Sequence, residues 1–228
     1  MSMKAYVEDF RDGSSGWAGH QKALEIDKGF AISRSPWWVD PNHAYPGGGY
    51  LHLLYVLWTT GPLAENNIDI AGVNRFVKGG FPTDFRNASV SVRIRGELDS
   101  KGAKLRLLAQ SQVGDRRVNS VLVSQSIEVN SEWSDQTIHL PPDDSQWLCI
   151  GSRHDMTDQY GYGPIEDVLK DLNLDIILVL HDLDVTPIRP VDGDPDIMRA
   201  GVDYEVDYSR LPSGYVMVDE IRIEFPID

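Results

Sequence analysis

The chain has a single cysteine, Cys149, among 228 residues. One thiol excludes an internal disulfide framework and any metal site built from several thiolates. Basic residues are also scarce, with 21 Lys and Arg against 35 Asp and Glu, and they form no run of five or more. The net charge of −14 argues against a protein that binds nucleic acid, because such proteins gather Lys and Arg against the phosphate backbone.

Long hydrophobic runs are missing as well. The longest, residues 174–183, is interrupted by Asp175, His181 and Asp182, so the sequence predicts no membrane insertion. Residues 1–8 contain no apolar stretch of the kind that a signal peptide needs. We therefore expect either a cytoplasmic protein or a mature or truncated form of an exported one. The sequence leaves the compartment, the oligomeric state and membership of a longer protein open.

The sequence is rich in strand patterns. In residues 88–98, valine and isoleucine alternate with serine and arginine, as in a β-strand with one face in water. Residues 175–180 are mostly apolar on both phases, which predicts a central strand covered on both faces. Ser100-Lys101-Gly102 is typical of a hairpin connection between two strands. Further strand patterns occupy residues 51–58, 104–110, 118–129, 137–140 and 215–225.

One segment predicts a helix convincingly. Gly163-Pro164 places a proline in the first turn, acidic residues follow it, and the apolar side chains up to Leu172 are spaced by three and four residues. Many strands and one short helix, at about 164–172, predict an all-β fold, a two-sheet jelly-roll β-sandwich. Because no linker divides the composition, we expect a single domain over residues 1–228.

Carboxylates stand at apolar positions in both terminal strands. Glu8 shares a phase with Tyr6 and Phe10, and Asp219 falls on the apolar phase of the last strand. A buried carboxylate is costly unless a cation or hydrogen-bond donors accompany it. We expect the two strands to lie side by side, where one carboxylate from each would suit a shared calcium ion, with Asp12 as a further ligand. The alternatives are a β-bulge that turns Asp219 outward, or an ion pair with an arginine.

Three short motifs resemble a known family. The opening residues 8–17, Glu-Asp-Phe followed by Gly and Gly-Trp, resemble the start of galactose-binding-like jelly-roll domains, which include many carbohydrate-binding modules. Residues 218–223 resemble the last strand of those domains, and residues 131–140 resemble a middle strand. The laminin-type globular domain IV is similar in the same way, though more loosely.

The resemblance implies a jelly-roll fold and a structural calcium near the first and last strands. Only Glu8, Asp12 and Asp219 match the positions that would hold that calcium. This chain is longer than a typical carbohydrate-binding module. We interpret residues 141–175 and 185–213 as insertions into the common fold.

Two loops combine flat aromatic faces with planar polar groups, the two chemistries that sugar recognition needs. From residues 35–46 the candidate ligand-binding residues are Trp37, Trp38, Asp40, Asn42, His43 and Tyr45. Residues 154–163 contribute Tyr160 and Tyr162. The alternative interpretation is that these aromatic side chains anchor their loops on the core.

We therefore expect a non-catalytic, lectin-like domain that binds carbohydrate and is stabilised by calcium. One alternative is a polysaccharide lyase or hydrolase on the same fold, and another is a protein-interaction or assembly domain. His181 and Asp182 follow a buried strand, where a base or metal ligands often stand, but no H-E-x-x-H, G-x-S-x-G or P-loop motif accompanies them. We assign no catalytic residue.

Overall fold

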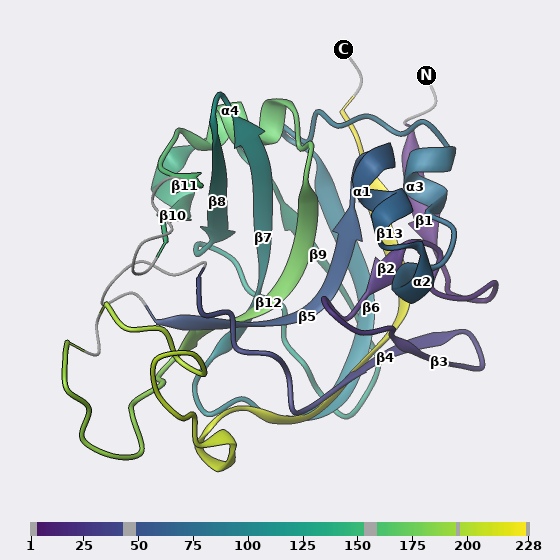
Figure 1. Cartoon of the computed structure of the whole chain (residues 1–228). Helices are drawn as coiled ribbons and strands as arrows, with labels where there is room; N and C mark the ends of the chain where they lie inside the picture. The colour runs from purple at the N-terminus through teal and green to yellow at the C-terminus, as the bar shows by residue number, and fades with distance from the viewer. Residues whose placement is uncertain (1–3, 43–48, 153–158, 195–196, 227–228) are drawn as a thin grey trace.

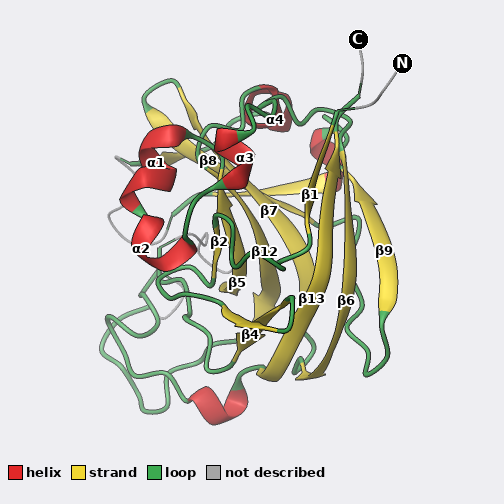
Figure 2. Ribbon diagram, turned by 90° about the vertical axis from the view of Figure 1, so that its right-hand side faces the viewer, coloured by secondary structure: helices red, strands yellow, loops and turns green. Residues whose placement is uncertain are grey.

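Two β-sheets pack face to face in the computed structural model, which describes residues 4–42, 49–152, 159–194 and 197–226 (Figures 1 and 2). The strands of both sheets are antiparallel, except for one short parallel pair. This arrangement confirms the predicted all-β sandwich. In the described part of the chain, no helix is long and apolar enough to cross a membrane.

Sheet A holds the first and last strands of the described chain side by side, as predicted. Glu8 lies opposite Ile221 in this pairing, and Tyr6 opposite Ile223. In sheet order, its six strands are β3 (Glu25–Asp27), β4 (Phe30–Arg34), β13 (Ser213–Glu224), β6 (Ser89–Asp99) and β9 (Ser134–His139), with β1 (Ala5–Glu8) also beside β13.

Sheet B has β12 near its centre, buried on both faces, as its apolar sequence predicts. Beside it, β7 forms a hairpin with β8, whose two turn residues are Gly114, at φ 62°, and Asp115. In sheet order, the seven strands are β10 (Trp147–Ile150), β8 (Arg116–Leu122), β7 (Lys104–Val113), β12 (Asp175–Leu183), β5 (Tyr50–Trp58) and β2 (Trp17–Ala18), with β11 (Tyr160–Gly161) parallel to β8.

The predicted hairpin at residues 100–102 is wrong. The turn is present, with Lys101 and Gly102 both at positive φ, but β6 before it belongs to sheet A and β7 after it belongs to sheet B. The turn is a corner between the layers. A tight turn has the same local composition in both cases, so the sequence gives no signal that separates them.

A β-bulge in β13 changes which of its side chains face the core. The register with β6 shifts between Val218 and Glu220, so that Val216, Val218 and then Ile221 point between the sheets. Asp219 and its neighbour Glu220 both point to the outer face as a result. One extra residue moves every later side chain to the other phase, which is why strict alternation placed Asp219 inside.

The prediction of one helix was incomplete. α4 (Ile165–Lys170) falls within the predicted range, and its Ile165, Val168 and Leu169 are buried. Residues 61–78 form further short helices beside sheet B that the sequence did not indicate (Figure 1). Segments of four to six residues are too short to show helical periodicity. These helices are α1 (Gly61–Asn66), α2 (Ile68–Ala71) and α3 (Arg75–Lys78).

The two segments interpreted as insertions both contribute to the body of the domain. Residues 141–175 contain β10, β11 and α4, and so supply edge strands to sheet B, together with a short 3-10 helix, η1 (Asp144–Gln146). Residues 185–213 contain another 3-10 helix, η3 (Tyr208–Arg210), and bury Ala200, Tyr204 and Leu211 in the main core.

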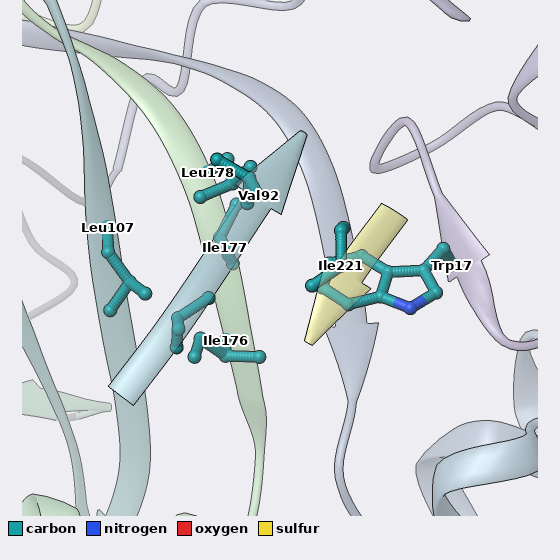
Figure 3. A pocket seen from close by; sticks show the side chains of 8 residues that line it. Trp17, Val92, Leu107, Ile176, Ile177, Leu178 and Ile221 are labelled. Carbon is teal, nitrogen blue, oxygen red and sulfur yellow. The ribbon is translucent and has the colours of Figure 1, made fainter. Parts of the chain in front are cut away.

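Between the sheets lies an apolar core with little free space. Val92 and Ile221 of sheet A face Leu107, Ile176 and Leu178 of sheet B around one small gap, with Trp17 at its side (Figure 3). The gap measures about 10 Å³, which is barely enough for one water molecule, and its lining is apolar. This part of the core therefore serves packing and offers no ligand site.

Candidate functional site

Glu8 lies in the core and its charge is balanced by the chain itself. The side chain is 0% exposed, and its Oε1 accepts a hydrogen bond from the Phe10 backbone N–H at 3.0 Å. The Tyr6 hydroxyl lies 3.4 Å from Oε2, and a guanidinium nitrogen of Arg75 lies 3.5 Å from Oε1. Burial raises the pKa of Glu8, and the Phe10 N–H and the Arg75 charge lower it.

Asp12 and Asp219 do not join Glu8 around a shared cation. Asp12 is exposed and lies 3.5 Å from the same Arg75 nitrogen, so α3 inserts a guanidinium between the two carboxylates. Asp219 lies on the opposite, outer face of sheet A, where it pairs with Arg93 at 3.1 Å. Glu8, Asp12 and Asp219 therefore do not fit the predicted common calcium site. Among the described residues, no group of three or more His, Cys, Asp or Glu is placed to hold a metal ion.

The first ligand loop divides into an anchor and a partly exposed part. Trp37 is 1% exposed, and its indole N–H donates to Ser33 Oγ at 2.9 Å, so it offers no face to a ligand and the anchoring alternative holds for it. Trp38 is half-buried and stacks on His20 with ring centres 4.4 Å apart. His43 and Tyr45 lie outside the described residues.

Asp40 and Asn42 stand beside the start of β5. The Asp40 backbone N–H donates to the Leu51 carbonyl at 2.9 Å, and its side-chain Oδ1 accepts from the Asn42 N–H at 2.9 Å. Asp40 is only 1% exposed, whereas Asn42 is half-buried. The loop is thus held on sheet B by backbone pairing, and it carries a buried carboxylate to that sheet.

Tyr160, from the second predicted loop, lies beside β8 in sheet B. It pairs in register with Arg117, whose guanidinium carbon lies 5.9 Å from the Tyr160 ring centre. Burial raises the pKa of the Tyr160 hydroxyl, Arg117 lowers it, and the charges of Asp40 and Asp175 raise it further.

Tyr162, two residues further on, is the most exposed large aromatic side chain of the described chain, at 69%. Gly151 has no Cβ, and a Cβ added there would stand 2.4 Å from the Tyr162 hydroxyl oxygen. The Tyr162 ring is therefore held by its tip against the β10 end of the sheet while most of its surface faces solvent. Such a ring offers a flat apolar surface for stacking.

The outer face of sheet B contains a buried polar row that the sequence analysis did not identify. Asp175, Gln110 and Asn119 lie side by side on adjacent strands and are 9%, 6% and 0% exposed. With its amide nitrogen turned toward the carboxylate, Gln110 donates to both Asp175 oxygens at 3.1 and 3.2 Å. The other end of this amide lies 2.8 Å from the Asn119 side chain. We call these three residues the polar row.

A second polar pair lies on the same face, nearer the other end of β12. Arg106 lies opposite Val179, and one of its terminal nitrogens lies 3.1 Å from Nδ1 of His181. The apolar side chains of Ile177, Leu108 and Val121 separate this pair from the polar row. The outer face of sheet B thus presents polar groups at two places with an apolar band between them.

The sequence alone does not show that the three residues of the polar row lie together, because this depends on how the strands pair. Asp175, Gln110 and Asn119 each stand alone within a strand pattern, about 65 residues or fewer apart along the chain. Only the register of β8, β7 and β12 aligns them. His181 was noted because it ends a buried strand, but its partner Arg106 was not.

Comparisons with known proteins do not identify a family. No family model matches the chain, and no curated protein matches it. Among solved structures, the L4b domain of human laminin alpha-2 matches over 100% of both chains, with a TM-score of 0.40 and 7% identity.

Two other solved structures match at the same distance. One comes from work on gut-bacterial endo-acting O-glycanases that initiate mucin breakdown (TM-score 0.36, 11% identity, 98% of this chain and 99% of the other). The other is the CBM2 module of the evolved Dit protein of Lactobacillus casei BL23 phage J-1 (TM-score 0.31, 8% identity, 100% of this chain and 99% of the other). At this distance these matches carry no weight for what the chain binds.

Proposed function

We propose that this chain is a carbohydrate-binding domain and that it binds the glycan on the outer face of sheet B. The observation that supports this most is the exposed ring of Tyr162, which stands at the β10 end of sheet B. The half-buried ring of Trp38, from the other predicted loop, packs against side chains of the same sheet. Sugars need aromatic rings beside polar groups, because the C–H face of a pyranose stacks on an aromatic ring while its hydroxyls bind planar polar groups.

Each kind of group has a defined part in this proposal. Tyr162 provides a stacking surface, Asn42 provides an amide, and the polar row lies in the floor between β12 and β8. Carboxylate and amide groups accept or donate two hydrogen bonds in a plane, which matches neighbouring hydroxyls of a sugar. Exposed stacking sites of this kind bind in the micromolar to millimolar range, about 4–8 kcal/mol.

A glycan array followed by isothermal titration calorimetry of each hit tests the proposal. We expect Tyr162→Ala to weaken binding of the hit at least tenfold, because the ring stacks on the sugar. Tyr208→Ala is the matched control, since Tyr208 is also an exposed tyrosine, at 47%, but lies in η3. Equal loss in both variants, or no loss in either, would contradict the placement of the site.

The array also separates the other two classes of function. Release of new reducing ends from a bound polysaccharide would indicate cleavage and replace the binding proposal with an enzyme. No binding to plant, microbial or animal glycans would contradict the proposal outright. Capture of a protein partner in that case would favour an interaction domain.

A further inference from the structure

Arg106 stands apart from most arginines of this acidic chain. A carboxylate lies within 4 Å of a guanidinium nitrogen in seven of the others: Arg11, Arg34, Arg75, Arg86, Arg93, Arg199 and Arg222. Arg106 is half-buried on the outer face of sheet B, and its hydrogen-bond partner among the described residues is the imidazole of His181. A cation removed from water without a counter-charge is costly.

The contacts of Arg106 leave one edge of its guanidinium without an acceptor. A terminal nitrogen donates to Nδ1 of His181 at 3.1 Å, which fixes the imidazole in the form that carries its proton on Nε2. The Arg106 Nε is buried and has no hydrogen-bond acceptor among the described residues. Nε and the second terminal nitrogen form the edge that pairs with a carboxylate or sulfate through two parallel hydrogen bonds.

Arg95 gives a useful comparison within the same chain. Its Nε is also buried without an acceptor, but its guanidinium lies over the Trp133 ring, 4.8 Å from the ring centre. The π-face of Trp133 compensates part of that charge. In the described chain, no aromatic ring lies over Arg106 in this way. An incompletely satisfied Nε therefore has a structural explanation at Arg95 and none at Arg106.

The charges around Arg106 have both signs. Burial lowers the pKa of Arg106, and the negative charge of Asp182 raises it. Lys104 lies two residues before Arg106 in β7, opposite His181, and is exposed. Asp182 makes no hydrogen bond to Arg106 in the described structure, so it offsets the charge at a distance and does not supply the acceptor that Nε lacks.

We infer that the free edge of Arg106 binds the acidic group of a carbohydrate, the carboxylate of a uronic or sialic acid or a sulfate ester. This inference rests on the proposed function and adds the class of glycan. The anion accepts from Nε and the second terminal nitrogen, while His181 holds the guanidinium in place from the other side. The buried side chains of Ile177 and Leu108 lie between Arg106 and the polar row and separate the two.

The test compares pairs of glycans that differ only in the acidic group. Suitable pairs are sialyllactose with lactose, trigalacturonic acid with its methyl ester, and a sulfated chondroitin oligosaccharide with its unsulfated form. For at least one pair, calorimetry is expected to show at least tenfold tighter binding of the acidic member. Arg106→Gln should abolish that preference, so that the acidic and the neutral member of the pair bind with equal affinity.

Two further variants separate a local contact from general electrostatics. Lys104→Gln removes one positive charge next to the site without touching the guanidinium, and we expect it to lower the affinity for the acidic member less than threefold. Arg95→Gln removes the same group from sheet A and should change neither affinity. Melting curves show whether each of the three variants is folded. The preference for the acidic glycan is measured on the unmodified protein, so that result stands even if a variant does not fold.

The outcomes separate this inference from the proposed function. If the protein binds glycans but every acidic member binds no tighter than its neutral partner, the inference is wrong and the proposed function stands. The same holds if Arg106→Gln weakens both members of a pair equally. If no member of any pair and no other glycan binds, the proposed function fails and takes this inference with it.

Discussion

Two polar regions of this domain differ in how their charges are balanced. At the first and last strands, Glu8, Asp12 and Asp219 each lie within 3.5 Å of an arginine that belongs to the chain. On the outer face of sheet B, Asp175 hydrogen-bonds to an amide, and Arg106 to an imidazole. In the first region each carboxylate has a guanidinium beside it, whereas in the second the Arg106 Nε has no acceptor among the described residues.

The difference indicates which buried charges serve the fold. A carboxylate that is already paired with a guanidinium needs no cation, so the region at the first and last strands is complete as a structural element. Buried polar groups whose hydrogen-bonding capacity is only partly used are expected at binding sites, where a ligand supplies the rest. The comparison therefore directs experiments on ligands to sheet B and experiments on stability to sheet A and the core.

The largest expected effect concerns His52, which lies 1% exposed beneath the first ligand loop. Its Nδ1 donates to the Trp38 carbonyl at 3.2 Å, and burial lowers its pKa to about 4. The unfolded chain takes up this proton near pH 6.5 and the folded chain only near 4, so stability is complete above 6.5 and falls with the pH below it. The difference amounts to roughly 3 kcal/mol by pH 4.

Denaturant titrations at pH 7 and pH 4 measure this effect. Carboxylates also titrate in this range, so the quantity of interest is the difference between the unmodified protein and His52→Gln. We expect the variant to lose roughly 3 kcal/mol less on going from pH 7 to pH 4. An equal loss in both proteins would show that His52 is protonated in the folded state or accessible to water.

Much of the fold follows from the sequence because strand patterns and buried side chains are local signals. The central position of β12 and the neighbouring terminal strands were predicted from such patterns. The corner at residues 100–102 was not, because the partner of a strand is decided by contacts far away in the chain. For the same reason the polar row was missed, since register alone brings its three residues together.

The calcium prediction for Glu8, Asp12 and Asp219 shows a different limit. The carboxylate at Glu8 is buried as the alternation indicates, and such a group does need a cation. The sequence does not reveal that the cation is Arg75, some 67 residues later, in a helix too short to be predicted. A single-residue bulge then removes Asp219 from the core, and no composition signal marks that bulge.

The second-largest effect is expected from Arg75→Met, which leaves Glu8 buried without its cation. Loss of the paired positive charge at a buried carboxylate costs about 2 kcal/mol, measured as the free energy of unfolding in urea. The double variant Arg75→Met with Glu8→Gln should recover about half of that loss, because the neutral amide needs no counter-charge. If the double variant is less stable than Arg75→Met alone, the Glu8 contacts with Phe10 and Tyr6 matter more than the ion pair.

A smaller effect is expected at Asp219, where the same kind of pair lies at the surface. The Asp219 and Arg93 side chains are 35% and 40% exposed, and Arg93 also contacts Asp135 at 3.0 Å. Because water screens such pairs, Asp219→Asn should lower the free energy of unfolding by no more than about 0.5 kcal/mol. A loss as large as that of Arg75→Met would mean that the bulge itself depends on this carboxylate.

The smallest expected effect, and the one that decides the calcium question, is the response of the melting temperature to EDTA. Arg75 occupies the space between Glu8 and Asp12, and Asp219 faces the other side of sheet A. We therefore expect the same melting curve in about 5 mM EDTA as in about 5 mM calcium. A bound calcium at about 100 times its dissociation constant would add about 2.7 kcal/mol, a shift that is easily seen. If calcium does raise the melting temperature, repeating the measurement with Asp12→Asn and Asp219→Asn locates the ion. Loss of the shift in either variant would restore the site predicted from sequence, whereas persistence in both would place the ion elsewhere.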